Sequence, residues 1–271
     1  MGTDDEVGFP DDGEGPQRSV QIGPFHLETA AVTNAEFEKF VKATRYKTEA
    51  EQFGWSFVFH SFVSSEAASR VIRSVLDTPW WWPVEGAYWN HPEGTGSTVR
   101  NRTNHPVVHI SWNDAAAYCE WSRKRLPTEA EWEFAARGGL EGKTYPWGDE
   151  LVPNGGHACN IWQGSFPDHN SKEDGYQGTA PARSFQPNGF GLYNVSGNVW
   201  EWCDDWFSPN FHLEGPRENP RGPESGGAKV IRGGSYLCHD SYCNRYRVAA
   251  RSANTPESST GNIGFRCARD V

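Results

Sequence analysis

Apolar residues recur at helical spacing in three stretches of the first half of the chain, and a capping pattern precedes each stretch. In the first, Thr33 and Glu36 have the spacing of a capping box, in which each side chain accepts a hydrogen bond from the other residue's backbone N–H. Phe37 and Phe40 then fall on one face of a helix. The pattern predicts a helix that begins after Thr33 and ends near Arg45.

Two further helices follow from the same kind of pattern. Ser111 can cap a helix that runs to about Arg123, and Thr128 and Glu131 have a second capping-box spacing. Gly138 comes after this third stretch, and glycine readily adopts the left-handed conformation that ends many helices. All three predicted helices therefore lie before the middle of the chain.

From Tyr145 onward the helical spacing disappears, and turns that combine glycine with aromatic residues replace it. Short strands joined by long loops fit this half of the chain, so the expected fold class is mixed α/β with little regular secondary structure. Gly215–Gly227 has the composition and length of a surface loop, which favours a single domain over residues 1–271. The candidate strands are Val107–Trp112, Lys229–Arg232, Arg245–Ala250 and Gly264–Ala268.

Composition sharpens this picture and argues against several classes of function. The chain has 13 Trp, 29 Gly and 18 Pro with 36% hydrophobic residues, which indicates a core of large rings joined by irregular backbone. A net charge of −10 argues against a nucleic-acid partner, because phosphate backbones bind basic surfaces. Mean hydropathy is −0.72, and no apolar run approaches the roughly 18 to 20 residues of a membrane helix, so no membrane partner is expected. A signal peptide begins with basic residues and continues with an apolar stretch, whereas residues 1–16 are acidic. No signal peptide is therefore visible, and a cytoplasmic location is expected.

Cys238 and Cys243 are the residues with the clearest chemical potential. They lie five positions apart on a loop that two glycines introduce, so their thiols can bridge or bind a metal together. Structural zinc usually takes four Cys or His ligands, and a second pair with suitable spacing is missing. Two thiolates suit a soft ion such as Cu(I), whereas a structural disulfide or two ordinary thiols remain equally acceptable from the spacing alone.

Other candidates have a structural interpretation that is the simpler one. His105 and His109 lie four apart in a predicted strand, too far from each other along it to share a metal, which favours structural roles for both. Asp168–Gly175 resembles a calcium loop but has Lys172 where a ligand is needed. The turn around Asn194 can be a plain turn or a hard-cation site. The tryptophans from Trp80 to Trp82 can pack in the core or line a cleft.

Several motifs taken together resemble the sulfatase-modifying-factor domain, and the resemblance spans nearly the whole chain. They are Arg125–Glu133, Tyr145–Gly148, Asn188–Trp202, Arg232–Ser235 and Gly264–Cys267. Within that domain, the run Leu237–Arg247, followed by Ala249–Ser252 and Asn254–Pro256, looks like the active-site segment of formylglycine-generating enzymes. Glu49–Glu51, together with Phe53–Gly54 and Ser56–Phe59, looks like their substrate-side segment.

This resemblance implies a compact fold related to C-type lectin domains and a copper-dependent oxidase. The implied reaction converts the cysteine of a Cys-X-Pro-X-Arg motif in a sulfatase polypeptide to formylglycine, with O2 as oxidant and an external thiol as reductant. It implies that Cys238 and Cys243 bind Cu(I), with Ser235, Tyr242 and Trp200 around the oxygen pocket. The implied substrate contacts are Ser56, Trp80, Trp81, His239 and Arg245. Two structural calcium ions are implied, one at Asn160, Ile161, Asp174 and Tyr176, the other at Asn194, Gly197, Val199 and Glu201.

The chain also departs from the family pattern. By comparison with the family pattern, we expect the first strand to be missing before Met1, and Trp55 stands where the vertebrate enzyme has an acidic residue. Ala136 and Val248 replace a vertebrate disulfide. The resemblance further implies that Cys119 lies beside Cys267, whereas Cys159 and Cys203 are expected to be reduced.

Two other functions are compatible with this domain. An iron-dependent sulfoxide synthase shares it but adds a helical domain with a three-histidine site, which this sequence lacks. A non-catalytic lectin-like binding module would not need a cysteine pair on the active loop.

Overall fold

The computed structural model describes residues 1–69, 71 and 75–271. The three predicted helices are confirmed as α1 (Asn34–Thr44), α4 (Trp112–Trp121) and α5 (Glu129–Arg137). Thr33, Ser111 and Thr128 cap them, each within a complete capping box. Gly138 ends α5 with φ 58°, as the sequence predicts.

Short helices add to these three in the described part of the chain. One of them, α2, begins at Thr48 with a fourth capping box, in which Glu51 is the partner. The sequence contains this signal, but five residues are too few to give a helical period. The short α-helices are α2 (Glu49–Phe53), α3 (Ser65–Ala68) and α6 (Phe211–Glu214), and the 3-10 helices are η1 (Pro10–Asp12), η2 (His60–Phe62) and η3 (Pro153–Gly155).

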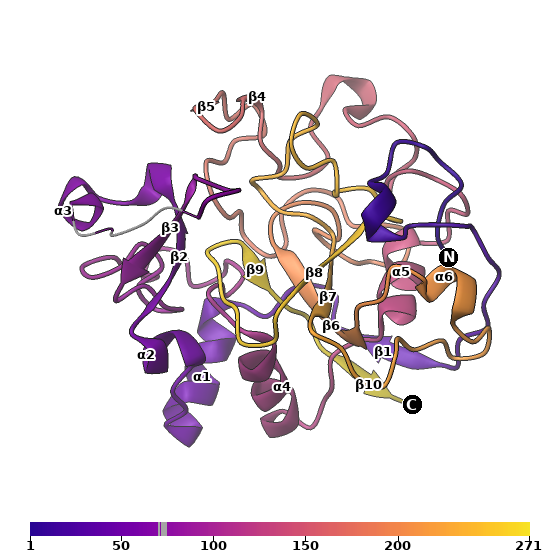
Figure 1. The fold of residues 1–271 in the computed structure, drawn as a ribbon, viewed down its shortest axis with the longest axis horizontal. Coiled ribbons are helices and arrows are strands. Elements are labelled where there is room, and N and C mark those ends of the chain that lie inside the picture. Colours follow the sequence, from indigo (N-terminus) through magenta and orange to yellow (C-terminus); the bar gives the residue numbers. More distant parts are fainter. Residues whose placement is uncertain (70, 72–74) are drawn as a thin grey trace.

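The central sheet has the strand order β8-β7-β6-β9, in which β6 and β9 are parallel and the other pairs antiparallel. Its strands are β6 (Trp200–Trp206), β7 (Lys229–Arg232), β8 (Arg251–Asn254) and β9 (Ile263–Gly264). Three antiparallel pairs surround it: β1 (Phe25–Leu27) with β10 (Ala268–Asp270), β2 (Trp55–Phe59) with β3 (Trp81–Glu85), and β4 (Gly164–Ser165) with β5 (His169–Asn170). Figure 1 shows the first of these pairs near the C-terminus and the second at the opposite side of the molecule, beside α3.

The strand predictions have mixed outcomes. Lys229–Arg232 is β7, but Val107–Trp112 is wrong, because His109 has φ 58° and Trp112 already belongs to α4. Arg245–Ala250 is also wrong, since this segment turns, with Ala250 N–H donating to the carbonyl of Arg247 at 3.1 Å. Gly264–Ala268 divides between β9 and β10.

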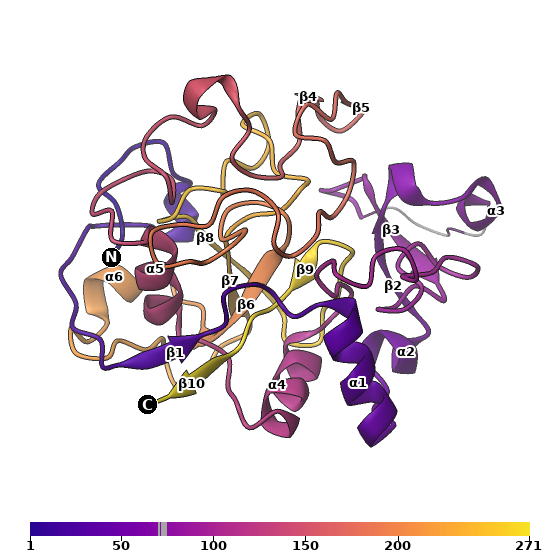
Figure 2. The same cartoon turned by 180° about the vertical axis from the view of Figure 1, so that it is seen from behind.

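The main core lies between the central sheet and helices α1 and α4, which run side by side in Figure 2. Its rings pack edge-to-face or stacked, as between Phe37 and Tyr118 with centroids 5.8 Å apart and Phe37 and Trp89 at 5.5 Å. The core is therefore built from large rings, as the high tryptophan content and the modest hydrophobic fraction predicted. None of the described helices is long and apolar enough to cross a membrane.

Candidate functional site

The two candidate cysteines lie on the loop that leaves β7. Gly233 and Gly234 open this loop with φ values of 90° and 69°, which only glycine adopts easily. A side chain at Gly233 would also meet the ring of Trp132 at 3.1 Å. This tight passage returns the chain so that the Sγ atoms of Cys238 and Cys243 are 2.7 Å apart, both buried as free thiols.

Neighbouring polar groups fix and polarise the two thiols. The backbone N–H of Ser235 donates to Cys238 Sγ at 3.4 Å, while Asn262 Nδ2 donates to Ser235 Oγ at 2.9 Å. Burial and the neighbouring thiol raise the pKa of Cys238. Burial also acts to raise the pKa of Cys243, but the hydrogen bond with Cys238 and the guanidinium of Arg245 outweigh it, so this pKa is lowered. The thiols are therefore unequal, and Cys243 is the more acidic.

The thiols line a cavity of about 160 Å³, and Trp80, Trp81, Trp200 and Tyr242 form the aromatic part of its wall. Tyr242 stacks on Phe166 with centroids 4.6 Å apart and planes 1° apart, and Trp80 meets both rings edge-on. The structure thus brings together eight of the ten residues that the resemblance assigned to chemistry and substrate. They are Cys238, Cys243, Ser235, Tyr242, Trp200, Trp80, Trp81 and Arg245.

The remaining two of those residues, Ser56 and His239, do not line this cavity. Ser56 is buried and hydrogen-bonded to Ser259 and, at 2.8 Å, to His109 Nδ1, so its hydroxyl holds the scaffold together instead of facing a ligand. The His239 ring turns away toward Ser241 Oγ at 2.8 Å and Asp240. Both were predicted from the resemblance alone, which carries no information on which way a side chain points.

The cavity also contains residues to which the sequence analysis assigned no role. Ser252, Asn254, Thr260 and Asn262 line it from β8 and from the segment that leads to β9. The one feature of the sequence that could have identified them is that they follow the cysteine loop. Polar residues separated by turns have no period, so only the fold shows that they face the thiols.

The residues of the two predicted calcium sites differ in their hydrogen-bond partners. The Asp174 carboxylate accepts N–H groups of Ile161 at 3.1 Å and Tyr176 at 2.9 Å, and burial raises its pKa. In the second group, Asn194 Oδ1 is buried without a hydrogen-bond partner among the described residues. The Glu201 carboxylate instead pairs with Arg266 at 2.6 and 2.7 Å, so its charge is already balanced.

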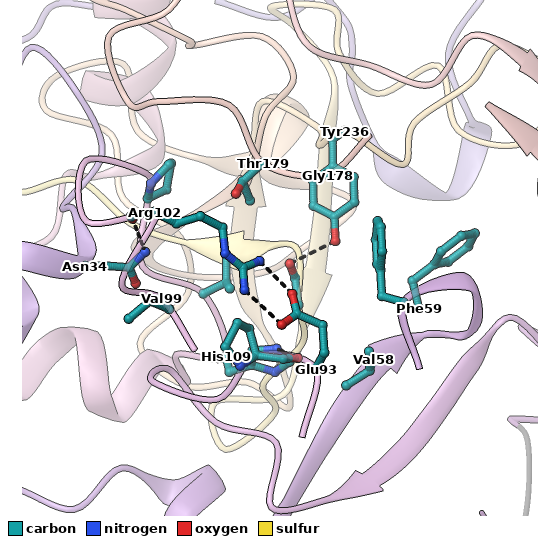
Figure 3. Close-up of a pocket in the computed structure, with 15 residues that line it drawn as sticks. Asn34, Val58, Phe59, Glu93, Val99, Arg102, His109, Gly178, Thr179 and Tyr236 are labelled. Atoms are coloured by element: carbon teal, nitrogen blue, oxygen red, sulfur yellow. Dashed lines mark hydrogen bonds and ion pairs between the residues drawn. The ribbon is translucent and has the colours of Figure 1, made fainter. Parts of the chain in front are cut away.

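A second cavity, of about 170 Å³, lies on the other side of the Tyr236 segment. Figure 3 shows Arg102 and Glu93 facing each other in it, joined by hydrogen bonds of 2.6 and 2.8 Å, with His109 below them. His109 is held at Nε2 by the carbonyl of Pro92 at 2.8 Å, and burial lowers its pKa to about 4. His105 bonds Thr179 Oγ1 at 2.9 Å. These separate partners support the prediction that both histidines have structural roles.

The remaining cysteines are buried within the core. Cys119 Sγ lies 3.4 Å from Cys267 Sγ, which confirms that the two residues are neighbours, and both are free thiols. Cys159 and Cys203 are free and belong to different core clusters. Ala136 and Val248 pack in the same cluster as Cys203, so apolar packing takes the place of a bridge there.

Comparison with known proteins decides the family. The pattern that defines the family described as "Sulfatase-modifying factor enzyme 1-like domain" matches residues 1–271. The chain belongs to this family. A "Formylglycine-generating enzyme" of Thermomonospora curvata is 61% identical over 274 residues, covering 100% of this chain and 90% of the relative.

Two other comparisons show what family membership says about activity and about fold. The "Inactive C-alpha-formylglycine-generating enzyme 2" of Bos taurus is 46% identical and covers 99% of this chain and 84% of the relative, so members of this family differ in activity. The structure of PvdO from Pseudomonas aeruginosa is similar with a TM-score of 0.70 and 25% identity, covering 100% of this chain and 90% of that one. This similarity confirms the predicted sulfatase-modifying-factor fold, mixed α/β with little regular secondary structure.

Proposed function

We propose that this protein is a formylglycine-generating enzyme that oxidises the cysteine of a Cys-X-Pro-X-Arg segment in a sulfatase polypeptide. The observation that carries the proposal is the pair of buried thiols, 2.7 Å apart, in a cavity that Trp80, Trp81 and Trp200 help to enclose. A lectin-like binding module would have no use for two unequal thiols in its cavity. The 61% identity to an enzyme of this name supports the same conclusion.

The residues of the cavity fit a copper ion. Cys238 and Cys243 offer two soft sulfur donors at one point, and two thiolates leave room for a third sulfur from the substrate cysteine. Zinc would favour a closed tetrahedron and has no redox chemistry. Copper, when bound by these two residues, would supply the one-electron chemistry that O2 requires.

The chain's own residues position the reactants. The rings of Trp80, Tyr242 and Trp200 keep water from the thiols and flank the space for an extended peptide. Ser235, held by Asn262, offers a hydroxyl beside Cys238. The proposed reaction consumes one O2 and oxidises two external thiols to a disulfide. The substrate Cβ becomes an aldehyde, its sulfur leaves as hydrogen sulfide, and the second oxygen atom leaves as water.

We further propose calcium ions with structural roles at the two oxygen-rich turns. The carboxylate of Asp174 is half-buried and accepts from uncharged N–H groups of Ile161 and Tyr176, so a cation bound there would balance its charge. The unpartnered Asn194 Oδ1 fits a ligand position in the second turn. The Glu201 side chain does not fit, because Arg266 already neutralises it.

The experiment that tests the proposal incubates the copper-loaded protein with a Cys-X-Pro-X-Arg peptide, O2 and dithiothreitol, and follows the aldehyde by mass spectrometry. Cys238→Ser and Cys243→Ser should each abolish turnover. Cys203→Ala is the matched control, because it changes a buried thiol outside the cavity and should retain the turnover of the folded protein. Full activity in both serine variants would exclude the assignment. Equal turnover by copper-free protein would exclude the metal mechanism while leaving the substrate assignment intact.

A further inference from the structure

The acidic stretch at the start of the chain packs against the segment that follows Cys243. Asn244 Nδ2 donates to the carbonyl of Val7 at 2.9 Å, and Arg247 binds Glu14 through two hydrogen bonds of 2.6 and 2.7 Å. Arg251 Nη1 donates to the carbonyl of Asp12 at 3.1 Å. Figure 1 shows this N-terminal segment, in indigo, beside the yellow C-terminal part of the chain. We name residues 7–14 the N-terminal arm.

One contact of the N-terminal arm reaches the thiol cavity through a single side chain. Asp12, which is buried, accepts from Arg245 Nε at 2.5 Å and from Nη2 at 3.2 Å, and the ring of Phe9 lies 3.7 Å beneath the same guanidinium. Arg245 lines the same cavity as Cys243. Asp12 thus holds the Nε–Nη2 edge of a guanidinium that belongs to the cavity wall.

The N-terminal arm is itself fixed in place. Gly13 has φ 62°, and a side chain there would lie 1.9 Å from the carbonyl oxygen of Pro209. The backbone of the arm therefore packs so closely against the loop before α6 that no side chain fits between them at Gly13. A rigid support of this kind allows the Asp12 carboxylate to define the position of a long, flexible side chain.

We propose that Asp12 is a positioning residue that acts through Arg245. By holding the Nε–Nη2 edge, Asp12 keeps the guanidinium beside Cys243, where its positive charge balances the negative charge of two thiolates binding Cu(I). The inference rests on the proposed function, since two thiolates and one Cu(I) carry a net negative charge that a buried site must compensate. A preoriented cation does this without reorganisation when the ion binds.

The test is a set of four variants: Asp12→Asn, Arg245→Gln, the corresponding double variant, and Glu14→Gln as the matched control. Glu14→Gln breaks an equally short carboxylate–arginine pair of the same arm, but its partner Arg247 does not line the cavity. For each, the Cu(I) dissociation constant is measured by competition with bicinchoninate, beside kcat, KM and Tm. Asp12→Ala is added as a second variant in case the amide still holds Arg245.

If Asp12 acts through Arg245, Asp12→Asn weakens Cu(I) binding by about tenfold, the effect of one charge-assisted hydrogen bond. The double variant then binds Cu(I) like Arg245→Gln alone, because the two changes remove the same interaction. Glu14→Gln lowers Tm without changing the dissociation constant of the folded protein.

Three results would overturn the inference: unchanged or tighter Cu(I) binding in both Asp12 variants, additive effects in the double variant, or an equal loss in Glu14→Gln. The Cu(I) titration needs no turnover, so it decides the role of Asp12 separately. A wild-type protein that binds Cu(I) but makes no aldehyde would contradict the proposed function alone.

Discussion

Glu133→Gln should destabilise the protein strongly, because Glu133 is a member of a buried ion cluster behind the cysteine loop. Its carboxylate accepts from Arg232 Nη2 at 2.8 Å and from Arg137 at 2.7 and 3.0 Å, and the side chains of Glu133 and Arg232 are fully buried. Burial alone would raise the pKa of Glu133, but the two arginines reverse this effect and lower it to about 2. The variant keeps the shape of the side chain and turns an NH2 group toward an arginine.

The size of the loss follows from the pKa. A depression from the usual 4.5 to about 2 corresponds to about 3 kcal/mol of folding free energy at pH 7. Removing one partner of a buried ion pair typically costs about 3–5 kcal/mol, which agrees. For a chain of 271 residues, this lowers Tm by about 5–9 °C, since the unfolding entropy scales with length.

The pH dependence supplies an independent check by differential scanning calorimetry. Because the folded pKa is depressed, the stabilisation is complete above about pH 4.5 and is lost as the pH falls toward 2. The Tm difference between wild type and variant should therefore shrink over that window. Asp149→Asn is the control, since its pair with Lys143 is exposed and its removal should barely change Tm. A Glu133 variant no less stable than this control, or a difference constant with pH, would refute the reasoning.

Three further predictions address the rest of the structure. Ser56→Ala should lower the free energy of unfolding by about 1–3 kcal/mol, because His109 loses a buried partner, yet leave KM for the peptide unchanged; a raised KM would return Ser56 to the substrate site. Calcium chelation, with removal verified by metal analysis, should lower Tm in wild type but less in Asp174→Asn; equal shifts would contradict a site at Asp174. The hydrogen bond with Cys119 and burial raise the pKa of Cys267, so iodoacetamide at pH 8 should label both thiols only after unfolding, as peptide mass spectrometry can check; equal labelling of native protein would contradict this.

The helices could be predicted because their signals are local. Thr33, Ser111 and Thr128 each accept the hydrogen bond that their sequence spacing implies, within three residues along the chain. Except for Lys229–Arg232, the strands could not be predicted with correct bounds, because short strands depend on partners far away in sequence. The longest one, β6, alternates only from Trp200 to Trp202, and the following Cys203, Asp204 and Asp205 break the pattern.

The family resemblance predicted which sequence positions belong to the site, but not where their side chains point. Cys238 and Cys243 were expected to act together, and their sulfur atoms do meet. Ser56 shows what position alone leaves out, since its hydroxyl points to His109 and not to the cavity. Asp12 shows the opposite case. It lies more than 230 residues before Arg245 in the sequence, and nothing in an acidic, glycine-rich stretch indicates which arginine it will bind.

The arginines around the cysteine loop explain how a chain with so little regular structure holds this loop in place. Between β7 and β8 the described backbone forms turns and no strand ladder, so the usual source of rigidity is missing there. Arginine–carboxylate pairs flank the loop instead. Arg245, Arg247 and Arg251 each bind one carboxylate through two hydrogen bonds, which fixes direction as well as distance. Arg232 instead bridges two carboxylates with one bond to each. The arginines are Arg232, Arg245, Arg247 and Arg251, and their partners are Glu129 and Glu133 of α5 with Asp12 and Glu14 of the N-terminal arm. This arrangement also accounts for the wrong strand at Arg245–Ala250. Arginines do alternate with apolar residues at the start of this segment, but Arg245 and Arg247 bind buried carboxylates instead of facing solvent. The alternation therefore results from ion pairing and does not indicate a β-strand.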